Sequence, residues 1–276
     1  MTRRPWEENP DFYHSSWKSM RLLIHLDLGA SDVAPLASHP LRLHARFSMR
    51  AAGPDGLRSA AEAEPLFALE DLLSSRFRQE VDALYVGRVI GGGEVNLVWY
   101  VRALGEGRLN ALGASAMELG GGYDIRLSVT EDPEWSFYFD FLFPDVYNLQ
   151  VMLNRRRLLT LEDHGDEGTR PRLVEHRARF GSRDEAEETR RRLEALGFEV
   201  DEPELEPEGG QAPYAAASGE ALSDAPDEPL GDWLLCFARR DSLASGRIDA
   251  VCIEILDALL PSMGHYEGWG SELQKS

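Results

Sequence analysis

The segment LRLHARFSMR, residues 41–50, alternates apolar and polar residues without interruption. Successive side chains of a strand point to opposite faces, so a period of two predicts a strand with one buried and one solvated face. Residues 21–28, RLLIHLDL, alternate in a similar way. Because antiparallel sheets commonly have one solvated face, we expect these segments to pair as neighbouring antiparallel strands.

The first part of the chain contains segments with helical spacing of apolar residues as well as segments with strand alternation. Apolar residues at helical spacing predict a helix over 62–81. Two further strands, DALYVGRVI and EVNLVWYV, are joined through the glycines at 91–93, which suit a hairpin turn with positive φ. The other predicted elements are helices near 108–118 and 146–160 and a strand at 123–129. We therefore predict an α+β domain over residues 1–165 with a mainly antiparallel sheet.

A second domain is predicted over residues 172–276. Its clearest helix, over 182–197, has a capping box of Ser182 and Glu185 and ends at Gly197. Strands are predicted at 173–180, at the short sequence FEV, at 233–239 and at 265–269, with a second helix at 247–260. This β-α-β-β-α-β order is that of a ferredoxin-like sandwich, in which the last strand lies beside the first.

The chain is strongly acidic, with a formal net charge of −19. A surface of this sign repels nucleic-acid phosphates and attracts basic proteins. Residues 201–229 hold nine acidic side chains, five prolines and no lysine or arginine, so we expect a flexible acidic loop there. No apolar run approaches the length of a membrane span, and the N-terminus lacks the apolar core of a signal peptide. We expect a cytoplasmic protein that binds neither membranes nor nucleic acid directly.

Groups that could perform chemistry are few. Cys236 and Cys252 lie in apolar runs, and the seven histidines show no HExxH-type spacing. We therefore predict no bound metal or other cofactor. Several carboxylates do lie close together in DPEWSFYFDFLFPD, residues 132–145. The alternative hypothesis is thus a metal- or small-molecule-dependent enzyme with a site near Asp132 and Glu134.

Aromatic residues mark a different kind of candidate site. The stretch GHYEGWGSEL keeps Tyr266 and Trp269 almost at the C-terminus, and Trp233 and Phe237 share one face of the strand at 233–239. Aromatic anchors dominate interface energetics, so the predicted partner-binding residues are Trp233, Phe237, Tyr266, Glu267 and Trp269. We expect Trp269 to close the last strand over the core and Glu267 to remain available, so that Glu267→Lys weakens binding and leaves stability nearly unchanged.

Three short sequences carry a family resemblance. LGFEVDEPELE (196–206), RIDA (247–250) and HYEGWG (265–270), in that order, resemble the bacterial regulator of ribonuclease activity B family, protein inhibitors of endoribonuclease E. The resemblance implies a ferredoxin-like domain that binds the basic, disordered scaffold region of that nuclease and alters RNA turnover without catalysis. The non-catalytic protein-binding regulator is accordingly the leading hypothesis.

The N-terminal domain resembles another bacterial family. LYVGRVIGGGEVNLVWYV (84–101) and DPEWSFYFDFLFPD (132–145) are similar to the domain of unknown function family number 695. That family has no settled activity, so this resemblance implies no partner, substrate or site residue.

Overall fold

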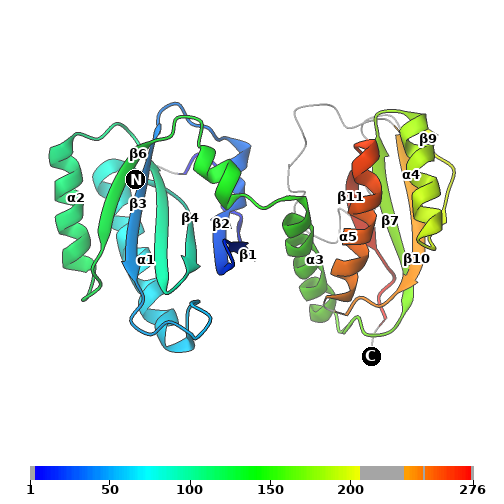
Figure 1. The fold of residues 1–276 in the computed structure, drawn as a ribbon, viewed down its shortest axis with the longest axis horizontal. Coiled ribbons are helices and arrows are strands. Elements are labelled where there is room, and N and C mark those ends of the chain that lie inside the picture. The colour runs from blue at the N-terminus through cyan, green and yellow to red at the C-terminus, as the bar shows by residue number, and fades with distance from the viewer. Residues whose placement is uncertain (1–3, 206–232, 245, 275–276) are drawn as a thin grey trace. The chain divides into compact units, whose positions relative to one another are not determined.

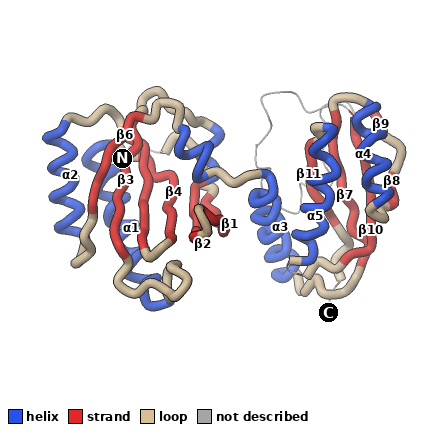
Figure 2. The backbone as a smooth tube through the Cα atoms, in the orientation of Figure 1, coloured by secondary structure: helices blue, strands red, loops and turns tan. Residues whose placement is uncertain are grey.

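The computed structural model describes residues 4–205, 233–244 and 246–274. The chain divides into two compact units, Met1–Asp145 and Val146–Ser276. Each unit has an antiparallel sheet and helices, which confirms the predicted α+β class (Figure 1, Figure 2). The acidic loop predicted over 201–229 lies outside the described residues from position 206 onward.

The first unit is built on a six-stranded sheet with the order β1-β2-β4-β5-β3-β6. Its strands are β1 (Pro10–Trp17), β2 (Met20–Asp27), β3 (Leu41–Ser48), β4 (Leu84–Gly91), β5 (Glu94–Val101) and β6 (Arg126–Glu131), and its helices are η1 (Leu28–Asp32), α1 (Ala60–Val81), α2 (Glu106–Leu119) and η2 (Tyr138–Leu142). The glycines joining β4 to β5 make the expected turn, with φ of +59° at Gly92 and +80° at Gly93.

The predicted pairing of residues 21–28 with 41–50 is wrong. Strand β2 pairs with β1 and β4, whereas β3 pairs with β5 and β6. Alternation fixes which face of a strand is buried but not which strand lies beside it. The sequence also did not predict β1, which forms one edge of this sheet.

Both faces of the first sheet are covered by apolar side chains. Helices α1 and α2 pack on one face around Leu43, Leu97 and Trp99. On the other face Trp135 is fully buried, and its ring stacks on Tyr100 with 3.8 Å between the ring centroids. This aromatic segment continues into η2 and makes the second face of the sheet part of the core.

The second unit has a sheet with the order β11-β7-β10-β8. Its strands are β7 (Arg172–Phe180), β8 (Glu199–Val200), β9 (Glu204–Leu205), β10 (Trp233–Asp241) and β11 (His265–Gly270), and its helices are α3 (Val146–Asp163), α4 (Arg183–Ala195), α5 (Arg247–Leu259) and η3 (Leu260–Ser262). The last strand, β11, lies beside the first, β7, as predicted. The sequence placed α3 in the first domain, but this helix packs on α5 within the second unit.

Local signals in the second unit gave the correct helices. Both hydrogen bonds of the capping box between Ser182 and Glu185 are present at the start of α4. Gly197 follows the helix with φ of +83°. Helix α5 buries the predicted face, which consists of Ile248, Val251, Cys252, Ile255 and Leu259. These apolar residues form the core between the helices and the sheet.

Candidate functional site

Strand β11 contains the HYEGWG motif and has a bulge at Glu267. In the register with β7, Tyr266 and Gly268 face consecutive residues, so Glu267 is an extra residue. A regular strand would send Tyr266 and Trp269, three positions apart, to opposite faces. The extra residue shifts the alternation by one position, and both rings therefore pack against the helix-side core. Gly268 has φ of +116°, a conformation that favours glycine.

Trp269 ties the last strand to two helices. Its side chain is 1% exposed, and its Nε1 donates a hydrogen bond of 2.8 Å to Asn154 Oδ1 on α3. The same oxygen accepts a 2.8 Å hydrogen bond from Gln150, and the Asn154 amide donates to Asp249 of α5, also at 2.8 Å. The Arg157 guanidinium lies 5.1 Å from the Trp269 ring centroid. A buried polar network of this kind fixes the strand against the helices.

Tyr266 belongs to a neighbouring cluster of neutral groups. Its hydroxyl lies 2.7 Å from His176 Nδ1 and 3.7 Å from the Cys252 sulfur. Burial raises the pKa of Tyr266 well above its usual value and that of Cys252 to about 11. Burial, together with the charges of Arg239 and Arg157, lowers the pKa of His176 to about 3. All three groups are thus neutral at neutral pH, which suits a structural network better than proton transfer or nucleophilic attack.

Glu267 projects to the opposite face of the sheet, where it meets two arginines of β7. Its Oε2 lies 3.2 Å from Arg177 Nε, and Arg179 Nε donates to its Oε1. The three side chains are between 8% and 13% exposed. Glu267 is therefore part of a fixed ion-pair cluster and not a loose surface carboxylate.

The aromatic face of β10 is the one that the helices cover. Phe237 is 3% exposed and stacks on His176, with 5.3 Å between ring centroids and 12° between the planes. Phe198 meets Phe237 edge to face at 5.5 Å. Trp233 is half-buried and lies under the Arg183 guanidinium at 5.8 Å. Of the five predicted contact residues, Phe237 and Trp269 thus lie in the core, whereas Trp233, Tyr266 and Glu267 are half-buried.

Sequence reasoning missed the α3 residues that complete this site. Gln150, Asn154 and Leu158 are four positions apart along one helical face, so their spacing was the available signal. That signal was ambiguous because polar residues on a helix are usually solvated. Only the packing of α3 on α5 shows that Gln150 and Asn154 are buried.

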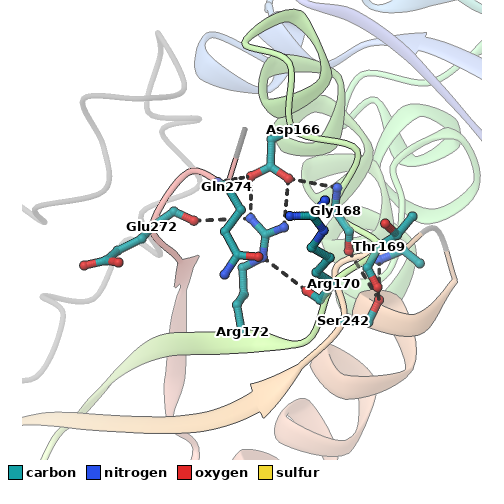
Figure 3. Close-up of polar contacts among 9 residues, drawn as sticks. Asp166, Gly168, Thr169, Arg170, Arg172, Ser242, Glu272 and Gln274 are labelled. Atoms are coloured by element: carbon teal, nitrogen blue, oxygen red, sulfur yellow. Dashed lines mark hydrogen bonds and ion pairs between the residues drawn. The ribbon is translucent and has the colours of Figure 1, made fainter. Parts of the chain in front are cut away.

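A buried ion pair that the sequence analysis also missed holds the segment after β11 in place (Figure 3). Asp166 and Arg172 form a bidentate ion pair in which they are 2% and 3% exposed. Asp166 also accepts from the backbone N–H of Gln274 at 2.8 Å, and Arg172 donates to the carbonyl of Glu272 at 3.2 Å. The Arg172 guanidinium holds the pKa of Asp166 well below its usual range. The chain after β11 is therefore held to the loop before β7.

Asp132, the carboxylate of the alternative enzyme site, has a structural role in the first unit. It is 7% exposed and accepts hydrogen bonds from the Tyr100 hydroxyl at 2.7 Å and from the backbone N–H groups of Ser136 and Phe137 at 2.8 and 3.1 Å. Glu134 is exposed. Asp132 thus caps the turn that leads into the aromatic segment, an arrangement that does not favour the enzyme hypothesis.

The described residues offer neither a clustered metal site nor a membrane-spanning helix. Within it, no three His, Cys, Asp or Glu side chains are grouped as a metal site would need. Its helices also include none with the length and apolarity of a membrane span.

Comparisons with known proteins agree with both sequence resemblances. Residues 8–143 match the model of the Family of unknown function (DUF695), and residues 152–271 match that of the Regulator of ribonuclease activity B family. No curated protein matches the chain. Among solved structures, the crystal structure of an unknown protein from Galdieria sulphuraria matches at 11% identity, covering 84% of this chain and 98% of that one with a TM-score of 0.21. The chain thus joins a DUF695-like segment to one that matches the Regulator of ribonuclease activity B family.

Proposed function

We propose that this protein is a non-catalytic, protein-binding regulator whose second unit engages a ribonuclease and so modulates RNA turnover. The observation that carries this proposal is the match of residues 152–271 to the Regulator of ribonuclease activity B family. On this proposal the protein works in the cytoplasm and contacts RNA only through its partner.

We further infer that the second unit is a ferredoxin-like domain. The strand order β11-β7-β10-β8 supports this inference. So does the chain order β7-α4-β8-β9-β10-α5-β11, in which the two short strands β8 and β9 together take the place of the second strand. Helix α3 is an addition to that scheme, since it precedes the first strand and packs beside α5.

We propose a basic segment, such as the scaffold region of an endoribonuclease E, as the partner. The exposed carboxylates of Glu199, Asp201 and Glu204 follow α4 at the β8–β9 edge of the sheet. Leu205, which is 63% exposed, pairs in β9 with Trp233 of β10. Carboxylates beside an apolar contact suit a chain that carries arginine or lysine next to apolar residues.

The proposed roles of the five predicted contact residues differ by burial. Trp233 and Glu267, which keep some exposed surface, would contact the partner directly. Phe237, Tyr266 and Trp269 would support that surface from the core side, since they pack within the helix-side core.

Binding of the full chain to the scaffold segment of an endoribonuclease E tests the function. We expect biolayer interferometry to show saturable binding that weakens between low and moderate salt, because exposed charge pairs are screened. Glu204→Lys should lower the affinity by roughly tenfold, mainly through the association rate. Glu118→Lys, the same charge change at an exposed position of α2, is the matched control and should retain full affinity.

Two outcomes would count against the proposal. Absence of binding at low salt would reject the ribonuclease as partner. Equal weakening by Glu204→Lys and Glu118→Lys would instead show a non-specific effect of net charge and would reject the β8–β9 edge as the contact.

A further inference from the structure

The first unit contains a polar cavity of about 460 Å³. The packing of the sheet and helices described above does not use this cavity. Its lining consists of Arg4, Ser74, Ser75, Arg78, Gln79, Ala83 and Tyr85. The volume falls within the range of pockets that hold small molecules, about 300–1,000 Å³. Two guanidinium groups and no carboxylate line this cavity, in a chain whose net charge is −19. The lining is therefore complementary to an anion.

Arg4 is held in place at the cavity by a buried carboxylate. Asp27 is 4% exposed and accepts from Arg4 Nη1 at 2.9 Å, from Trp6 Nε1 at 2.8 Å and from the backbone N–H of Asn9 at 2.8 Å. Glu8 adds an ion pair with Arg4 at 3.1 Å. These contacts use Nη1, whereas Arg4 Nε is buried and has no hydrogen-bond partner in the described structure.

Ser74 and Arg78 lie one turn apart on α1 and both line the cavity. The Ser74 hydroxyl is buried without a hydrogen-bond partner, a state that costs about 1–3 kcal/mol when nothing compensates it. Arg78 has no ion pair among the residues described. Nearby Arg76 on the same helix is paired with Glu80 at 3.3 Å. Two buried donors without a partner, Arg4 Nε and the Ser74 hydroxyl, thus belong to residues that line one cavity together with Arg78.

One acidic group of α1 near the cavity, Glu70, is already neutralised. Glu70 lies one turn before Ser74 and accepts from Arg88 at 2.5 and 2.7 Å and from the Tyr85 hydroxyl at 2.6 Å. Tyr85 therefore turns its hydroxyl to Glu70 and contributes ring surface to the cavity. An anion beside Ser74 therefore meets the positive charge of Arg78, which has no ion pair among the described residues, and hydrogen-bond donors of Arg4, whose charge Asp27 and Glu8 already balance.

We propose that this cavity binds an oxyanion, a phosphate or carboxylate group of a small molecule, through Arg4, Ser74 and Arg78. The guanidinium groups supply charge-assisted hydrogen bonds, the Ser74 hydroxyl gains the partner that it lacks, and the Tyr85 ring covers an apolar part of the ligand. The cavity lining lies wholly within the first unit, so a failure to bind anions would leave the ribonuclease proposal standing.

Titration of the full chain with inorganic phosphate and with acetate, at ionic strength held constant with chloride, tests this site. We expect isothermal titration calorimetry to detect saturable binding of at least one of the two anions, and the preferred anion identifies the group on the natural ligand. Arg78→Gln should weaken that binding by about tenfold or more, the loss expected for one charged hydrogen bond. Arg76→Gln removes the same charge from the same helix outside the cavity lining and should bind like the parent protein.

Ser74→Ala gives a second test that does not depend on arginine. Without ligand this variant should be as stable as the parent or slightly more stable, because it removes an unpaired buried hydroxyl. With saturating anion, the rise in the unfolding midpoint that binding produces should be smaller than in the parent. Equal affinity in Arg78→Gln, Arg76→Gln and the parent protein, or no saturable binding of either anion, would overturn the proposal.

Discussion

The two sheets of this protein are alike on the helix-covered face and differ on the other. In the first unit the opposite face buries aromatic rings, among them Trp135 and Tyr138, which are both fully buried. In the second unit the opposite face of β7 carries Arg177 and Arg179, joined by Glu267 from β11. Aromatic residues of the first unit thus complete a three-layered core, whereas the second unit places charged groups where the first has a third layer.

The two sheet faces are expected to contribute differently to stability. A face covered by apolar side chains contributes to stability through burial. A face with paired charges contributes less stability, because the desolvation of each ion offsets much of the attraction. Variants that act on one unit alone can test this contrast.

Trp269→Ala should cause the largest loss of stability, and this loss should be confined to the second unit. Removing a buried tryptophan costs about 4 kcal/mol, and the variant also leaves Asn154 without its indole donor. Hydrogen exchange of β7 and β10 peptides should accelerate strongly while peptides of β4 and β5 are unchanged. Trp135→Ala should give the converse pattern. Equal acceleration in both units for either variant would mean that the units do not unfold separately.

Asp166→Asn should cost about 3 kcal/mol, because Arg172 would remain buried without its counter-charge. The pKa of Asp166 is lower in the folded protein than its value of 3.8 in the unfolded chain. The ion pair therefore stabilises the folded protein fully at pH values above about 4, and this stabilisation is lost as the pH falls below that value. In urea unfolding, the free energy of unfolding of the parent protein should therefore fall more steeply below about pH 4 than that of the variant. Parallel pH profiles would contradict this role for Asp166.

Glu267→Lys should cost about 2 kcal/mol, since it places three cations together on the face of β7. The sequence alone suggested no loss of stability, so this variant distinguishes a free carboxylate from a paired one. Glu267→Gln keeps the shape and should cost less. Thermal unfolding measures both variants, and an unchanged midpoint for Glu267→Lys would show that the ion pairs add nothing.

Trp17→Ala should have the smallest effect. Its side chain is 52% exposed and meets Phe141 edge to face at 5.9 Å, so we expect a loss below about 1 kcal/mol. Denaturant unfolding should show a transition close to that of the parent protein. A loss as large as that of Trp269→Ala would mean that Trp17 supports the aromatic face of the first sheet.

The sequence predicted elements whose signals are local. The capping box at Ser182, the stop at Gly197 and the apolar face of α5 each depend on residues within a few turns, and each was confirmed. The neighbours of β2 and β3 were not predictable, because strands of the same alternation can pair in several orders. Helix α3 was assigned to the wrong unit for a similar reason, since its partner α5 lies far along the chain.

The candidate site was predictable in part. The expectation that Trp269 closes the last strand over the core is confirmed by its burial. The ion pair of Glu267 was not, because Arg179 lies 88 positions earlier in the chain. The orientation of the aromatic face of β10 also had no local signal, since both faces of that strand are largely apolar.

The bulge in β11 makes the length of the motif as important as its residues. Because Glu267 is the extra position between Tyr266 and Gly268, deleting one residue there would restore simple alternation and send one of the two rings out of the core. A substitution changes one side chain, but a deletion would exchange the inside and the outside for the rest of the strand. We therefore expect related chains to vary the residue at the bulge more freely than the number of residues between the tyrosine and the tryptophan.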